Sequence, residues 1–234
     1  MIRLAAAVAA TAAAAAALLA GPAFAAERSY PVGSFDRIAL EGSPEVSVIT
    51  GRAASVRATG DADALDHLDV RVDNATLKIG HKREGWNWSW SSHPRIRFVV
   101  TVPALRAVDV AGSGDVSVDR VRGHEFAANI AGSGSLTLAA LDADTTSFNV
   151  SGSGTVTAAG RCGTGSAKVS GSGELKLAAL RCTALSAAVA GSGSIDAFAT
   201  GSATLATMGS GDITLTGGAR CTTSTAGSGR VRCS

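Results

Sequence analysis

The stretch Val110-Ala111-Gly112-Ser113-Gly114-Asp115-Val116 contains a motif that returns throughout the second half of the chain. The tripeptide Gly-Ser-Gly occurs seven times, beginning at Gly112, Gly132, Gly152, Gly171, Gly191, Gly209 and Gly227. Successive copies are separated by 18 to 20 residues. A repeat of this period indicates a solenoid, in which each unit buries its apolar face against its neighbours.

A strand pattern flanks every copy of the motif. With the first glycine counted as position one, positions five and seven are apolar and position six is polar, which predicts a strand with one buried face. A second strand is predicted before each copy, where an apolar residue or threonine stands two positions ahead. The predicted inward positions are Val110, Val116, Val118, Ile130, Leu136, Leu138, Val150, Val156, Ala158, Val169, Leu175, Leu177, Val189, Ile195, Ala197, Thr207, Ile213, Leu215, Thr225, Val231 and Cys233.

Two short strands and two turns in about twenty residues cannot bury an apolar face alone. Stacking them at ~4.8 Å per coil gives a continuous, narrow core. The sequence therefore predicts an all-β fold, namely a single-stranded, right-handed parallel β-helix with coils of about 20 residues and an N-terminal β cap.

The glycines of the motif are predicted to form a tight turn at one corner of every coil. Such a corner requires a positive φ, which glycine adopts at little cost. The serines between them, from Ser113 to Ser228, are expected to bond along the stack. A phosphate-binding loop is disfavoured because strands follow the glycines, where that loop needs a helix. The structural-turn residues are Gly112, Gly114, Gly132, Gly134, Gly152, Gly154, Gly171, Gly173, Gly191, Gly193, Gly209, Gly211, Gly227 and Gly229.

The first half of the mature chain is predicted to belong to the same body. Strand patterns cover residues 35–40, 46–49, 56–59, 68–72, 76–79 and 98–103. Between the first two, residues 41–45 resemble a degenerate copy of the glycine corner, and Asp61 is expected to start one helical turn. We expect one domain over residues 26–234, with N-terminal strands and a cap in 26–105 and regular Gly-Ser-Gly coils in 106–234.

The first 25 residues are predicted to be a secretory signal peptide. A short basic start is followed by an apolar run from Leu4 to Ala20, and Ala23-Phe24-Ala25 fits a cleavage site. No second apolar run of membrane length follows, so we expect no transmembrane segment after cleavage. The predicted location is periplasmic or extracellular.

The four cysteines support export, because an even number in a secreted chain favours disulfides. Cys162 and Cys182 each lie nine residues before the next motif, so they share a column in adjacent coils, about 5 Å apart and within bridging range. Cys221 and Cys233 would then fasten the last coil.

Composition and spacing argue against several functions. The charge of +2, from 21 basic and 19 acidic residues, gives no footprint for nucleic acid. No His or Cys spacing indicates zinc, and we expect no cofactor, no metal and no catalytic residues. The closest approach to a catalytic pair is Glu174 with Asp212, two coils or roughly 9.6 Å apart, near the outer limit for glycoside hydrolysis.

Trp86, Trp88 and Trp90 alternate along one predicted strand, which places three indoles on one face. If that face is exposed, it is a stacking platform for sugar rings. If it is buried, it is a hydrophobic cap over the open end of the solenoid.

The chain resembles the head GIN domain family, whose members are regarded as autotransporter adhesins of bacterial envelopes. The resemblance rests on residues 35–38, 60–65, 76–79 and 102–105, and most specifically on residues 110–116. It implies an exported right-handed β-helix with no established catalytic residues. We therefore expect a non-catalytic envelope or secreted protein, adhesin-like or structural, whose partner is an envelope glycan or protein. The alternative is a carbohydrate-active enzyme, a lyase or hydrolase, that acts along the side of the helix.

Overall fold

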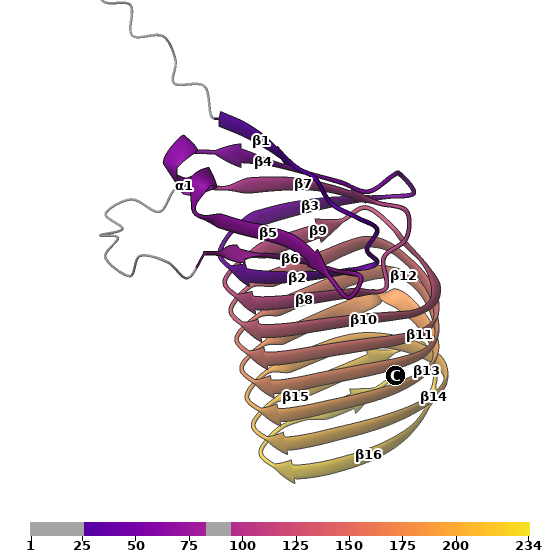
Figure 1. Ribbon diagram of the computed structural model, residues 1–234. Coiled ribbons are helices and arrows are strands. Elements are labelled where there is room, and N and C mark those ends of the chain that lie inside the picture. Colours follow the sequence, from indigo (N-terminus) through magenta and orange to yellow (C-terminus); the bar gives the residue numbers. More distant parts are fainter. Residues whose placement is uncertain (1–25, 83–94) are drawn as a thin grey trace, which may run out of the picture.

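The computed structural model describes residues 26–82 and 95–234 (Figure 1). The predicted signal peptide, residues 1–25, and the strand with Trp86, Trp88 and Trp90 lie outside the described residues. Within the described part of the chain, no helix has the length and apolar character needed to cross a bilayer.

The predicted all-β solenoid of coils of about 20 residues is confirmed. Long strands stack in parallel, each hydrogen-bonded to the strand one coil earlier and one coil later. The stack comprises β8 (Ala107–Gly112), β9 (Asp115–Val118), β10 (Val121–Gly132), β11 (Ser135–Gly152), β12 (Thr155–Gly171), β13 (Glu174–Gly191), β14 (Ser194–Gly209), β15 (Asp212–Thr216), β16 (Arg220–Gly227) and β17 (Val231–Cys233).

Each coil contributes to two sheets that meet at the glycine corners. We call the sheet whose strands run into the corners the entry sheet, and the sheet whose strands leave them the exit sheet. The entry sheet contains β8, β16 and the last segments of β10 to β14, whereas the exit sheet contains β9, β15, β17 and the first segments of β11 to β14.

In β11 to β14 the second turn of the coil does not interrupt the strand, whereas β9 and β10, and likewise β15 and β16, are separate strands as predicted. Neighbouring coils bend at the same place, so the hydrogen bonds between them continue around the bend. Coils of unequal length are accommodated there by shifts of register. Leu138 pairs with Ala158 but Leu141 pairs with Gly160, and Gly160 has a φ of +131° where the shorter coil closes up.

The core is a narrow column of aliphatic side chains between the two sheets. Nearly all the predicted inward positions are buried, from Val110 to Leu215. Phe126 and Phe148 widen it on adjacent coils, with ring centroids 6.4 Å apart. In the last coil, Thr225 and Cys233 are exposed and Val231 is half-buried, because no later described coil covers them.

The glycine corners are linked through the backbone. The first glycine of all seven copies has a φ between +117° and +130°. Its carbonyl accepts hydrogen bonds from the next corner, as Gly112 does from the N–H groups of Ser133 at 2.9 Å and Gly134 at 3.0 Å. The stack therefore runs through amides rather than through the expected ladder of serine hydroxyls. Gly42 joins the same stack, so the degenerate corner is confirmed.

The N-terminal end departs from the parallel pattern. β2 (Arg37–Gly42) and β3 (Glu45–Thr50) form the first coil, and β6 (Thr76–His81) and β7 (Arg97–Val102) pair with them in parallel. Antiparallel strands then end both sheets. β5 (Leu68–Asp73) pairs with β6, while β4 (Ser55–Gly60) pairs with β7 and β1 (Ala26–Tyr30) pairs with β4.

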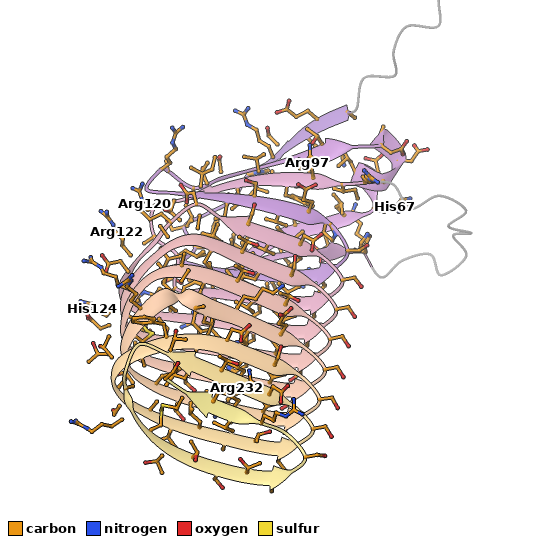
Figure 2. All side chains as sticks on the ribbon, turned by 180° about the vertical axis from the view of Figure 1, so that it is seen from behind. His67, Arg97, Arg120, Arg122, His124 and Arg232 are labelled. Atoms are coloured by element: carbon orange, nitrogen blue, oxygen red, sulfur yellow. A yellow bond between two sulfur atoms is a disulfide. The ribbon has the colours of Figure 1, made fainter. Side chains whose placement is uncertain are left out.

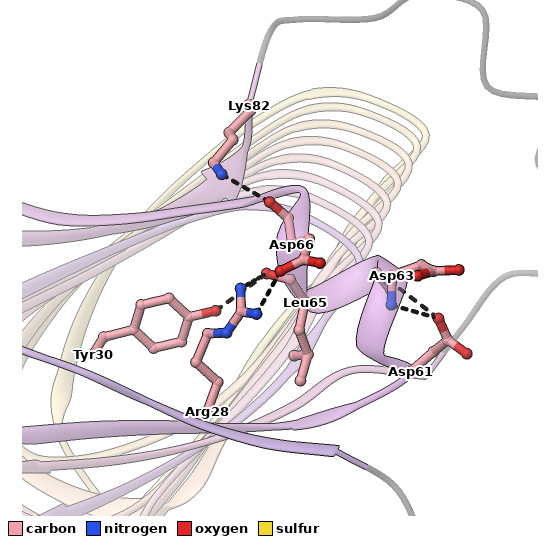
Figure 3. A network of polar contacts seen from close by, with 8 residues as sticks. Arg28, Tyr30, Asp61, Asp63, Leu65, Asp66 and Lys82 are labelled. Atoms are coloured by element: carbon pink, nitrogen blue, oxygen red, sulfur yellow. Dashed lines mark hydrogen bonds and ion pairs between the residues drawn. The ribbon is translucent and has the colours of Figure 1, made fainter.

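A short helix, α1 (Ala62–Asp66), lies at this end beside β1 and β4 (Figure 1). The expected helical start at Asp61 is confirmed, since its carboxylate accepts hydrogen bonds from the N–H groups of Asp63 and Ala64. Three long side chains converge on the other end of the helix (Figure 3). Arg28 and Tyr30 donate to the Leu65 carbonyl, and Lys82 donates to the Asp66 carbonyl.

Electrostatics reinforce this network. The Arg28 guanidinium also pairs with the Asp66 carboxylate, and this hydrogen bond lowers the pKa of Asp66. Partial burial raises the pKa of Tyr30 above its ordinary value. In the neighbouring hairpin, Lys78 lowers the pKa of Asp73 in the same way. Polar contacts thus hold β1 against α1, around the buried side chains of Ala64 and Leu65.

Candidate functional site

A polar ladder runs along the outer face of the entry sheet. Asp109, Asn129 and Asn149 occupy equivalent positions on β8, β10 and β11. The Asn129 amide donates to the Asp109 carboxylate at 2.6 Å, and the Asn149 amide donates to the Asn129 carbonyl oxygen at 2.9 Å. Each side chain fixes the next, so the ladder presents ordered polar atoms to solvent on three successive coils.

Small side chains surround the ladder and leave a hollow of about 330 Å³ above it. Ala111 and Ala131 are exposed beside the ladder, with Ser151 on the next coil. Glu41, on β2, lines the end of this hollow nearest the N-terminal strands. Lys168 pairs with Asn149 and so continues the column on β12. A flat floor with directed amide and carboxylate groups is the chemistry that orients a polar ligand.

The exit sheet has a different hollow, of about 580 Å³, lined by Glu45, Arg97 and Asp115 among others. Glu45 stacks directly beside Asp115 on adjacent coils. Both carboxylates are engaged, since Arg97 binds Glu45 through two nitrogens at 3.0 and 3.2 Å and Ser135 donates to Asp115. Sequence reasoning missed this pair, although Glu45 follows the degenerate corner as Asp115 follows the first full one.

The carboxylates of Glu174 and Asp212, the closest approach to a catalytic pair predicted from the sequence, also bind neighbouring groups. Glu174 and Asp212 lie two coils apart in one column, as the spacing predicts. The Glu174 carboxylate pairs with Lys176 at 3.0 Å, and the Asp212 carboxylate accepts from the Arg230 backbone N–H at 2.9 Å. Neither arrangement aims a carboxylate at a shared reaction centre.

Both disulfides join the cysteines that the sequence register pairs. Cys162 and Cys182 link β12 to β13 with a Cα–Cα distance of 4.5 Å, and both are buried. Cys221 and Cys233 join the entry and exit sheets of the last coil with a Cα–Cα distance of 6.5 Å. Their role is to fasten coils rather than to take part in a binding surface.

Charged side chains gather along the bend between the two sheets. Arg120, Arg122 and His124 project from this edge (Figure 2). Further along it, Arg161 pairs with Asp142 at 2.7 Å, and the Arg181 guanidinium lies 5.2 Å from the Phe198 ring centroid. Acidic and basic groups alternate here, which is typical of a solvated edge. Across residues 26–82 and 95–234, no three His, Cys, Asp or Glu side chains converge as metal ligands would.

Comparison with known proteins agrees with this architecture. The model of the family described as "Putative auto-transporter adhesin, head GIN domain" matches residues 34–219, which include every coil from β2 to β15. The chain belongs to the head GIN domain family. No curated protein matches it.

Solved structures share the fold of this head GIN chain at low sequence identity. A putative adhesin from Bacteroides fragilis is 21% identical with a TM-score of 0.79, over 89% of this chain and 96% of that one. A putative lipid binding protein from Parabacteroides distasonis is 23% identical with a TM-score of 0.74, over 92% and 98%. A putative adhesin from Parabacteroides merdae is 16% identical with a TM-score of 0.71, over 92% and 98%.

Proposed function

We propose that this head GIN protein is exported to the bacterial envelope and acts there as a non-catalytic, adhesin-like binding protein. Its ligand, an envelope glycan or protein, lies on the outer face of the entry sheet. Two disulfides support an oxidising compartment, as does membership of a family described as adhesins.

The observation that supports the proposal is the ladder of Asp109, Asn129 and Asn149 with the hollow above it. The three side chains fix one another at 2.6 and 2.9 Å, so little side-chain freedom is lost when a ligand binds. Small neighbours leave the ladder accessible on both sides. Ordered, exposed polar groups on a rigid sheet serve recognition.

A binding screen with residues 26–234 tests the proposal. The purified chain is immobilised and exposed to a glycan array, purified peptidoglycan and outer-membrane vesicles. We expect binding that Asn129→Trp weakens, because the indole covers the ladder. The matched control is Thr137→Trp, at an exposed position of the exit sheet.

Two outcomes contradict the proposal. One is the absence of binding to every probe, and the other is binding that Thr137→Trp removes while Asn129→Trp does not. Turnover of an acidic polysaccharide that disappears in the Glu174→Gln, Asp212→Asn double variant would instead support the alternative function, a carbohydrate-active enzyme.

A further inference from the structure

The hollow above the polar ladder continues into a larger one beside the N-terminal cap. The larger hollow has a volume of about 700 Å³ and is lined by side chains of β5, β6 and β2, including Asp69, Arg71, Lys78 and Gly80. Glu41 lines both hollows. The two therefore meet at one carboxylate on the same outer face.

Strand pairing gives this surface its length. β5, β6, β2, β8, β10 and β11 are successive neighbours in the entry sheet, and all six line one hollow or the other. Five steps of ~4.8 Å span roughly 24 Å along the solenoid axis. We call this surface the entry-face track.

Between the charged side chains near the cap and the polar ladder, the floor of the track consists mainly of glycine and alanine. Gly80 lies beside Glu41, so that a Cβ at Gly80 would be 3.4 Å from the Glu41 carboxylate oxygen. Ala39, Ala111 and Ala131 continue the floor toward the ladder. A sugar ring has an apolar face of C–H groups that can lie flat against such a floor.

The track offers both donors and acceptors of hydrogen bonds to a ligand. Arg71 pairs with Asp69, Lys78 pairs with Asp73, and Lys82 donates to the Asp66 carbonyl, and each of these cations keeps further N–H groups for a ligand. Glu41 makes no hydrogen bond or ion pair within the described residues, and each of Asp109 and Asn149 keeps an oxygen free. Hydroxyl groups, which both donate and accept, match this mixture. The three carboxylates of Glu41, Asp69 and Asp109 are balanced by the three cations, so the track has no net charge that would favour a polyanion or a polycation.

We propose that the entry-face track binds an extended, uncharged polysaccharide whose chain runs along the solenoid axis. This inference rests on the proposed function and names its ligand class. Hydroxyl groups donate to Glu41, Asp109 and the amide ladder, while the sugar rings lie over the glycine and alanine floor.

Titration calorimetry tests the inference with two oligosaccharide series of matched lengths, one of uncharged β-linked glucose and one of polygalacturonate. The uncharged series should bind, with an affinity that rises with length and does not change between 50 and 500 mM salt. Ala111→Trp should weaken that binding by about tenfold or more, because the indole fills the track. Ser117→Trp, on the exit sheet of the same coil, should leave it unchanged.

A second variant distinguishes hydroxyl donors from ammonium groups. Glu41→Gln keeps an acceptor and removes the charge, so binding of an uncharged chain should persist, whereas binding of an amine-bearing polymer would be lost. Preferential, salt-sensitive binding of polygalacturonate would overturn the inference, as would uncharged binding that Ala111→Trp does not affect.

The two proposals fail differently. If envelope fractions bind but neither oligosaccharide series does, the ligand class is wrong and the binding function stands. If nothing binds in either experiment, both are wrong. Unchanged circular dichroism and melting temperature for both Trp variants exclude misfolding as the cause.

Discussion

At the scale of single residues, the two glycines of each corner are needed for different reasons. Gly152 has a φ of +117°, and a Cβ there would lie 2.6 Å from the Gly132 carbonyl oxygen of the previous coil. Gly154 has an ordinary φ, but its Cβ would lie 2.6 Å from Ile130 Cγ2 and 2.8 Å from the Gly134 carbonyl oxygen. The first glycine is needed because the turn has a positive φ, and the second is needed because neighbouring coils approach too closely for a Cβ.

We expect Gly152→Ala to destabilise the protein, because the left-handed backbone alone costs about 1–3 kcal/mol and the contact with Gly132 adds to it. Gly123→Ala is the matched control, since its Cβ would have no neighbour nearer than 3.9 Å. Urea unfolding of both variants measures the difference. Equal stabilities would contradict the account of the corner.

The Thr146 hydroxyl is the opposite case, a polar group whose removal should help. It is 1% exposed and has no hydrogen-bond partner among the described residues. Thr146→Val keeps the shape and removes the desolvation cost, so we expect stability to rise by about 1 kcal/mol. Thr207→Val is the control, because it deletes a hydrogen bond to the Gly211 carbonyl at 3.1 Å and should give no such gain. Thermal unfolding distinguishes the two, and a destabilised Thr146→Val would show that the hydroxyl has a partner.

At the scale of elements, the two disulfides fasten different parts of the solenoid. Cys162–Cys182 spans 20 residues and holds two central coils, whereas Cys221–Cys233 spans 12 and holds the last coil alone. In a solenoid each coil depends on its neighbours, so a break in the middle spreads in both directions.

Replacing both Cys162 and Cys182 with Ala should therefore lower stability by about 3 kcal/mol, the loop-entropy estimate for a link of this length. The Cys221→Ala, Cys233→Ala variant should fray only the last coil, which hydrogen exchange detects as lost protection in β16 and β17. Non-reducing peptide mapping checks the connectivity. A Cys162–Cys221 peptide would contradict the register.

The attachment of β1 should depend on pH. The pKa of Asp66 is lowered from its ordinary value of 3.8, chiefly by its hydrogen bond with Arg28. A lowered carboxyl pKa contributes stability that is complete above the ordinary value and is lost as the pH falls through the lowered one. We expect the contact between β1 and α1 to weaken only below pH 3.8, reported by the NMR ring signals of Tyr30, the single tyrosine. Asp66→Asn should abolish this pH dependence, and a transition near neutral pH would contradict the assignment.

At the scale of the whole molecule, the sequence predicts the regular coils much better than it predicts their ends. Each inward position of the coils repeats at a fixed distance from a glycine pair, so an alignment of copies identifies Val110, Leu136 and Ile195 as core. The antiparallel direction of β1, β4 and β5 has no such signal, because alternation records which face is buried and not which strand lies beside it.

The candidate site was missed for a related reason. Asp109, Asn129 and Asn149 lie one position before the inward residue that precedes each motif, and they share a column only once the coils are stacked. Their individual residue types indicate nothing beyond solvent exposure. Trp86, Trp88 and Trp90, by contrast, stand out in the sequence, and their role as cap or platform stays a prediction.

Deletion of one complete coil tests the modular character of the solenoid. Removing residues 133–152 joins Gly132 to Ser153 and restores the motif, so the remaining coils keep their register. We expect a soluble protein with an unchanged β-type circular dichroism spectrum and a melting temperature lower by several degrees, because one interface between coils is lost. Removing residues 133–142 instead breaks the register and should prevent folding. A folded half-coil deletion would contradict the model of independent units.

The glycine corners also have a genetic consequence. Since every coil begins and ends at the same tripeptide, unequal recombination between two copies adds or removes a whole coil without a frameshift in the stack. The outer face of the entry sheet then lengthens or shortens by ~4.8 Å, and a duplicated coil keeps the side chains of the coil it copies. Copy number therefore sets the length of the proposed entry-face track in steps of one coil.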